Sequence, residues 1–111
     1  MILDTNALSA YLDSTPEAVE IVSQAREVAI PVIVAGEFIF GIAQSRHQEA
    51  YERSLQRMLD RCAVLEIGVE TARHYAAIRL ELKAAGKPIP ANDAWIAALS
   101  RQHPMPVMSR D

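Results

Sequence analysis

Short apolar runs and longer amphipathic stretches alternate along the chain. Each short run is largely apolar rather than alternating, which is typical of strands in a parallel sheet that is covered on both faces. Pro31 cannot donate a hydrogen bond to a sheet, so we expect it at the end of its strand. Four strands are predicted in this way, at residues 1–3, 28–33, 63–67 and 106–109.

Helices are predicted between these runs. The clearest is 48–62, where Tyr51, Leu55 and Met58 fall on one stripe. Asn6 and Asn92 are expected to cap the helices that follow them, and Gly86 to end the helix before it. The predicted helices follow Asn6 and occupy residues 16–27, 34–43, 48–62, 69–85 and 92–103.

The order of elements favours an α/β fold. Strands separated by helical segments pair in parallel, and the connecting helices then cover both faces of the sheet. No internal repeat, low-complexity tract or linker divides the sequence. We therefore expect a single domain over residues 1–111, with a mostly parallel central sheet of about four strands.

The composition is that of an ordinary globular protein, with half of the residues hydrophobic and 23% charged. No apolar run approaches the roughly 20 residues that a membrane-spanning helix needs. The single cysteine, Cys62, excludes an internal disulfide and fits a reducing cytoplasm. A net charge of −3 argues against a protein that coats nucleic acid, but not against an enzyme whose site holds metal cations.

Four acids are expected at one edge of the sheet. Asp4 follows the first predicted strand, and Asp111 follows the last. Glu37 and Asp93 lie in the early turns of helices. Because strand ends and the starts of the following helices share one edge of a parallel sheet, the four side chains can converge there.

Such a convergence is costly without a cation, so the four acids must become protonated, form hydrogen bonds or hold a metal ion. Two carboxylates about 4 Å apart repel by roughly 4 kcal/mol at an effective dielectric constant near 20. Ligands that are all oxygen suit Mg²⁺ or Mn²⁺, which can activate water and neutralise charge on a phosphodiester. Hydrolysis of a nucleic-acid backbone is the reaction that best explains the four acids together, although each acid alone is more often a helix cap.

The motifs that carry these acids resemble those of the PIN-domain family, and in particular its VapC-type toxins. The resemblance covers essentially the whole chain and rests on Leu3-Asp4-Thr5-Asn6, Gly36-Glu37, Pro90 to Ala97, and Ser109-Arg110-Asp111. By this resemblance the fold is a three-layer α/β/α sandwich. The metal-binding and catalytic positions of the family match Asp4, Glu37, Asp93 and Asp111, and the small polar positions beside them match Thr5, Asn6, Asn92 and Ser109.

The resemblance also implies an activity and partners. It implies an endoribonuclease that depends on Mg²⁺ or Mn²⁺ and cuts RNA, transfer RNA included, by metal-activated water. It further implies a homodimer in the cytoplasm that a cognate antitoxin holds inactive. The family usually continues past Ser-Arg-Asp into a closing strand, whereas this sequence stops at Asp111. We therefore expect that strand to be missing and the fourth acid to be the least certain ligand.

Other functions remain open at this point. A PIN fold that only binds a partner would be marked by the loss of an acid, whereas all four acids are present in this sequence. A phosphoacceptor signalling domain would have a lysine after its last strand, where this chain has Arg110. A phosphatase of the haloacid dehalogenase type would have a second aspartate at the position of Asn6. The apolar run from Phe38 to Phe40 is either core or a partner surface.

Overall fold

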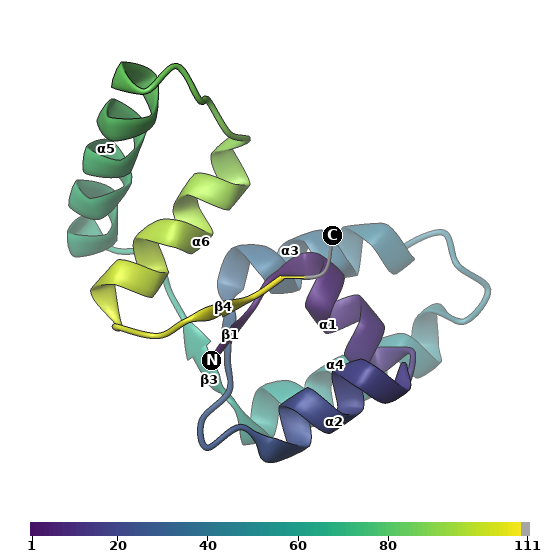
Figure 1. Cartoon of the computed structure of the whole chain (residues 1–111). Coiled ribbons are helices and arrows are strands. Elements are labelled where there is room, and N and C mark those ends of the chain that lie inside the picture. The colour runs from purple at the N-terminus through teal and green to yellow at the C-terminus, as the bar shows by residue number, and fades with distance from the viewer. Residues whose placement is uncertain (110–111) are drawn as a thin grey trace.

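The computed structural model describes residues 1–109, which form four short strands and six helices (Figure 1). The predicted strands are present and are shorter than expected. In chain order the elements are β1 (Ile2–Leu3), α1 (Thr5–Leu12), α2 (Pro16–Gln24), β2 (Ala29–Pro31), α3 (Val32–Ile42), α4 (Gln48–Arg61), β3 (Ala63–Leu65), α5 (Val69–Ala84), α6 (Ala91–Gln102) and β4 (Val107–Met108).

The four strands form one parallel sheet in the order β3-β2-β1-β4. Ile2 is opposite Ala29 on one side and Val107 on the other, so β1 is a central strand. Pro31 is the last residue of β2, as predicted, and α3 begins immediately after it. The α/β class and the parallel sheet inferred from the sequence are therefore confirmed.

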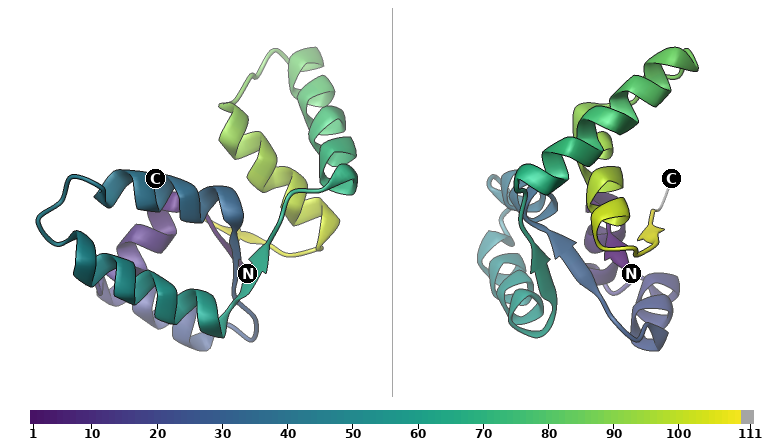
Figure 2. Two further views of the ribbon diagram at one scale, coloured as in Figure 1. Left: turned by 180° about the vertical axis from the view of Figure 1, so that it is seen from behind. Right: turned by 90° about the vertical axis from the view of Figure 1, so that its left-hand side faces the viewer.

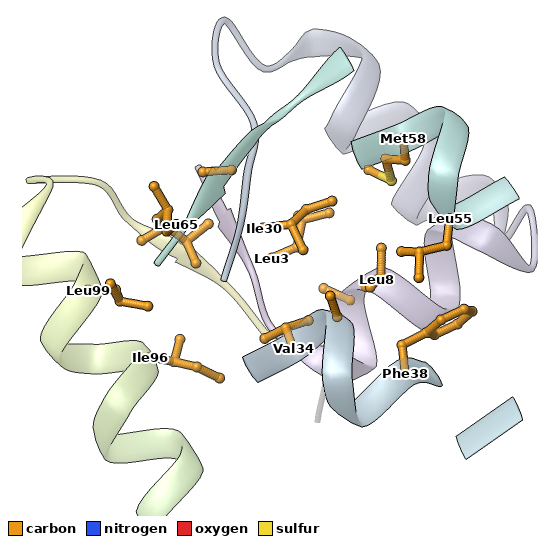
Figure 3. Close-up of a cluster of buried hydrophobic side chains, with 14 of the residues drawn as sticks. Leu3, Leu8, Ile30, Val34, Phe38, Leu55, Met58, Leu65, Ile96 and Leu99 are labelled. Atoms are coloured by element: carbon orange, nitrogen blue, oxygen red, sulfur yellow. The ribbon is translucent and has the colours of Figure 1, made fainter. Parts of the chain in front are cut away.

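Helices cover both faces of this sheet. Helices α1 to α4 gather on one side, while α5 and α6 form a hairpin on the other (Figures 1 and 2). Leu3 and Ile30 of the strands lie between Leu8 and Val34 on one side and Leu99 of α6 on the other (Figure 3). The three-layer arrangement follows from these contacts, because both faces of the strands are apolar and need a cover.

The α5–α6 hairpin projects away from the sheet (Figure 2). Helix α5 makes its extensive contacts with α6 alone. Its fully buried residue is Thr71, whereas the neighbouring Ala72 is exposed. The Thr71 hydroxyl accepts a hydrogen bond from the Gly68 amide at 3.1 Å and donates one to the side-chain oxygen of Gln102. A polar residue can be buried here because both of its hydrogen bonds are satisfied.

The ends of the helices differ in part from the prediction. Gly86 ends α5 as expected, with a positive φ of 68° that glycine adopts without steric cost. Asn6 does not cap α1, because Asp4 takes that position and Asn6 lies inside the helix. Asn92 likewise lies inside α6, which begins after Pro90. In both cases the extended residue that precedes the helix lies two positions earlier than expected.

Candidate functional site

Residues that follow β1 and β4 meet at one edge of the sheet. Asp4 comes directly after β1, and Ser109 directly after β4. The Asp4 amide donates to the Met108 carbonyl oxygen at 3.2 Å, which continues the pairing of the two strands past their ends. Asp4 and Ser109 are therefore neighbours, as the parallel topology requires.

A pocket of about 330 Å³ opens at this edge. Asp4, Asn6 and Ser109 come to it from the sheet and from the start of α1, and Asp93 comes from the first turn of α6. Ile96, Ala97 and Val107 complete its lining. The structure thus brings together two of the four acids and two of the four small polar residues singled out in the sequence.

Asp4 is oriented by the helix that it caps. Its backbone is extended, with φ −81° and ψ 178°, and one carboxylate oxygen accepts the Ala7 amide hydrogen at 2.8 Å. The other oxygen has no hydrogen-bond partner within residues 1–109. Because the cap engages only one carboxylate oxygen, it holds the Asp4 side chain in place and leaves the second oxygen available for a ligand.

Glu37 lies next to this pocket rather than in it. Its carboxylate accepts a hydrogen bond from the Thr5 hydroxyl at 2.8 Å, and Thr5 is the residue after Asp4. Both Thr5 and Glu37 are half-buried, and both line a second pocket of about 310 Å³. Through Thr5, Glu37 is therefore tied to the segment that carries Asp4.

The remaining predicted residues are placed differently. Asn92 is exposed in the first turn of α6 and does not line the Asp4 pocket. Asp111 lies outside the residues that the structure describes. Within residues 1–109, no three side chains of the types His, Cys, Asp and Glu lie close enough to hold one metal ion between them. The described part of the site therefore has two acids in one pocket and a third in the pocket beside it.

The donor atoms of the Asp4 pocket suit a hard cation. Carboxylate, amide and hydroxyl oxygens of Asp4, Asp93, Asn6 and Ser109 line it, and among residues 1–109 no nitrogen base or thiol does. Mg²⁺ prefers such oxygen ligands and commonly binds through one or two carboxylates, with water completing its shell. The pocket residues therefore fit a Mg²⁺ or Mn²⁺ ion in their chemistry.

Tyr51 and Cys62 have shifted pKa values, and both lie away from this pocket. The Tyr51 hydroxyl donates to the Asp13 carboxylate at 2.7 Å, and this hydrogen bond raises the pKa of Tyr51. Partial burial raises the pKa of the Cys62 thiol, more than the neighbouring Arg61 lowers it. Cys62 is partly buried against the main apolar cluster. A thiol with a raised pKa is a poor nucleophile at neutral pH.

Sequence reasoning missed that Asp4 is both the N-cap of α1 and a residue of the pocket. Aspartate is among the preferred N-cap residues, so the signal was present at Asp4 as well as at Asn6. The partner of Glu37 could not be read from the sequence, because Thr5 and Glu37 belong to different helices. No helix within residues 1–109 is long and apolar enough to span a membrane.

Known proteins resemble this chain over most of its length. The sequence profile of the PIN domain matches residues 1–111. The protein named ribonuclease VapC2 of Rickettsia felis is 29% identical over 101 residues, which cover 87% of this chain and 75% of that protein. Toxin FitB of Neisseria gonorrhoeae is 31% identical, with 100% of this chain and 87% of that protein covered.

Solved structures share the fold. VapBC-5 from Mycobacterium tuberculosis, described as a member of the VapBC family of toxin–antitoxin systems, superposes with a TM-score of 0.76 at 26% identity. The superposition covers 99% of this chain and 83% of that one. The likeness therefore extends over the sheet, the helices on both of its faces and the edge that carries the pocket.

Proposed function

Because the chain belongs to the PIN domain family, we propose that it is an endoribonuclease and the toxin of a toxin–antitoxin pair. The names of its relatives, ribonuclease VapC2 and toxin FitB, support both parts of this proposal. The single observation that carries it is the pocket in which Asp4 and Asp93 meet, with Asn6 and Ser109 beside them. Two carboxylates in one open pocket are suited to cation-assisted hydrolysis of a phosphodiester.

Asp4 and Asp93 would hold a Mg²⁺ or Mn²⁺ ion, with Glu37 as a nearby third acid and Asp111 as a fourth from the sequence. When bound, such an ion makes water a stronger nucleophile and offsets the negative charge on the phosphodiester. The bond to Ala7 holds the Asp4 carboxylate in place, and Thr5 holds Glu37. The Asn6 amide and the Ser109 hydroxyl supply donors for phosphate oxygens.

RNA is the proposed substrate, and transfer RNA is the first class to test. The direct assay incubates the purified chain with a mixed RNA pool that contains transfer RNAs, in Mg²⁺, in Mn²⁺ and in EDTA. Discrete cuts that need the metal and disappear in Asp4→Asn and Asp93→Asn are expected. If the wild-type chain leaves every RNA intact in both metals, the nuclease proposal is wrong and the alternative of a non-catalytic binding module takes its place.

A homodimer is proposed from the outer face of α3. The sequence did not decide whether the apolar run from Phe38 to Phe40 is core or a partner surface. In the structure Phe38 is 4% exposed and belongs to the core, whereas Phe40 is 85% exposed. Val32 and Ile39 on the same helix are also exposed. Contiguous exposed apolar side chains commonly mark an interface. Light scattering should show a dimer for the wild-type chain and a monomer for Phe40→Glu; a wild-type monomer would contradict the proposal.

The cognate antitoxin is the second proposed partner, and the cytoplasm is the proposed location. The presence of VapBC-5, a toxin–antitoxin system, among the similar structures supports the first. The unpaired cysteine, Cys62, fits the second, because free thiols persist in a reducing compartment. Co-expression with the product of an adjacent gene should relieve growth inhibition by the wild-type chain and should leave Asp93→Asn cells unaffected.

A further inference from the structure

The free end of the α5–α6 hairpin gathers positive charge in a protein whose net charge is negative. Arg79, Lys83 and Lys87 lie there, and no acid occurs between Leu82 and Asn92. The acid on the neighbouring turn, Glu81, is bound by both Nη atoms of Arg101, at 2.7 and 2.9 Å. This is the only ion pair within residues 1–109, so the three cations have no carboxylate partner there.

A pocket of about 370 Å³ lies among these cations. Arg79 and Lys83 supply its polar part, and Leu80, Leu82, Pro88 and Ile89 supply its apolar part. We call this the tip pocket. A cavity that combines cations with apolar surface fits a ligand with the same division, namely an anionic backbone that carries flat, weakly polar rings.

Arg79 is already oriented in the tip pocket. Its Nη1 donates to the Tyr75 hydroxyl at 2.7 Å, and its guanidinium carbon lies 5.6 Å from the centre of the Tyr75 ring. Tyr75 in turn stacks on Trp95, with ring centres 3.8 Å apart and planes 14° apart. A guanidinium that is held in this way loses less conformational entropy when it binds a phosphate.

We call the pocket that contains Asp4 and Asp93 the acidic pocket. The tip pocket lies close to it along the chain. Ile89 lines the tip pocket and Asp93 lines the acidic pocket, four positions later. Even a fully extended chain of four residues spans at most about 14 Å. A polynucleotide of a few residues can therefore occupy both pockets at once.

We propose that the tip pocket binds the single-stranded RNA segment that flanks the scissile phosphate. Arg79 and Lys83 contact its phosphates, and a base packs on Pro88 and Ile89. The proposal rests on the proposed ribonuclease function and adds the surface that holds the substrate. It concerns single strands because the tip pocket can take an unpaired base, whereas bases in a duplex are stacked and enclosed.

The test measures binding separately from cleavage. A fluorescein-labelled oligouridylate is titrated in EDTA, where a metal-dependent cut cannot occur, against wild type and Arg79→Gln/Lys83→Gln at several salt concentrations. The affinity of the double variant should fall about tenfold, and its salt slope should flatten by about 1.4, since each phosphate contact on a single strand contributes about 0.7. Arg79→Lys/Lys83→Arg, which keeps both charges, should restore the salt slope.

A matched control separates local from general charge effects. Arg26→Gln removes an exposed arginine from the loop that follows α2, at the far side of the molecule from the hairpin. Its binding and salt slope should equal those of the wild type. Equal loss in Arg26→Gln and in the tip variant, or no loss in the tip variant, would overturn the proposal even if the wild-type chain cuts RNA. Tighter binding of an acidic peptide than of the oligonucleotide would also overturn it.

Discussion

The sheet with α1 to α4 and the hairpin of α5 and α6 are built on different principles. In the first region, strands and helices share one apolar cluster that reaches from Ile2 to Met58. In the second, α5 packs on α6, and the hairpin joins that cluster mainly through Ile96 and Leu99. The first region is held together by a core. The second is joined to that core by a narrow set of apolar contacts around Ile96 and Leu99, which we call the seam.

This difference matters because the candidate site draws on both regions. Asp4, Asn6 and Ser109 belong to the sheet edge, whereas Asp93 belongs to the hairpin. The distance between the two carboxylates therefore depends on how the hairpin is seated. The stability of the fold and the geometry of the candidate site therefore both depend on the contacts that Ile96 and Leu99 make with the apolar cluster.

Loss of either acid should abolish activity, whichever region carries it. Asp4→Asn and Asp93→Asn should each lower the RNA cleavage rate by about 10²–10⁴-fold, because a neutral amide is a far weaker partner for a cation or a proton. Rates are measured on the RNA that the wild type cuts. A large loss in one variant with near-normal activity in the other would mean that the two regions do not form one site.

Asp4 allows its two roles to be separated by comparing two variants. Asp4→Asn keeps an N-cap side chain for the Ala7 amide, whereas Asp4→Ala removes it and should lower the free energy of unfolding by about 1 kcal/mol. Both variants should be inactive. Equal stability of the two by urea unfolding would show that the cap contributes nothing.

The seam should be the most sensitive place for stability. Leu99 is fully buried between α6 and the sheet, so Leu99→Ala should lower the free energy of unfolding by about 2–5 kcal/mol. Leu80→Ala is the matched control on the same hairpin, because Leu80 is 69% exposed, and it should change stability by less than about 0.5 kcal/mol. Similar losses in the two variants would contradict the description of a narrow seam.

The polar contact inside the hairpin should have a smaller effect. Thr71→Val removes the hydroxyl that joins the Gly68 amide to Gln102, and should lower the free energy of unfolding by about 1 kcal/mol. Thr71→Ser keeps the hydroxyl and should recover part of the loss. In Thr71→Val, amide hydrogen exchange in α5 should be faster than in the wild type, whereas exchange in α4 should be unchanged, since only the hairpin is loosened.

The surface pair Glu81–Arg101 should have the smallest effect and a defined pH dependence. The hydrogen bond from Arg101 lowers the pKa of Glu81, so the pair stabilises the fold above the ordinary glutamate pKa. This contribution is lost as the pH falls through the lowered pKa, where Glu81 takes up a proton. The melting temperature of Glu81→Gln should therefore fall slightly below that of the wild type at neutral pH and equal it in acid.

The sequence was informative wherever a local rule decides the structure. The apolar runs located all four strands, Pro31 marked a strand end, and Gly86 ended α5. The sequence could not choose between neighbouring capping residues, because Asp4 and Asn6 are equally good caps and only the path of the chain after β1 decides. The sequence also could not show that the hairpin projects from the sheet. Nor could it show that Thr71 is buried and Ala72 exposed, because that difference depends on hydrogen bonds made in the folded structure.

The same limit applies to the candidate site. Topology alone placed Asp4 beside Ser109, because parallel strands end at a common edge. Topology could not predict that Glu37 would engage Thr5, which depends on how α1 and α3 cross. Nor could it predict which cations lack a partner, because the pairing of Arg101 with Glu81 joins two helices at the surface.

The pairing of β1 with β4 bears on the order in which the molecule is made. Ile2 leaves the ribosome well before its partner Val107, because helices α1 to α6 lie between them in the sequence. Contacts between such distant segments form late, because the intervening chain must be closed into a loop first. The acidic pocket therefore cannot assemble on a nascent chain that lacks α6 and β4. Asp4 and Asp93 would therefore be brought together only after the whole α5–α6 hairpin has been synthesised.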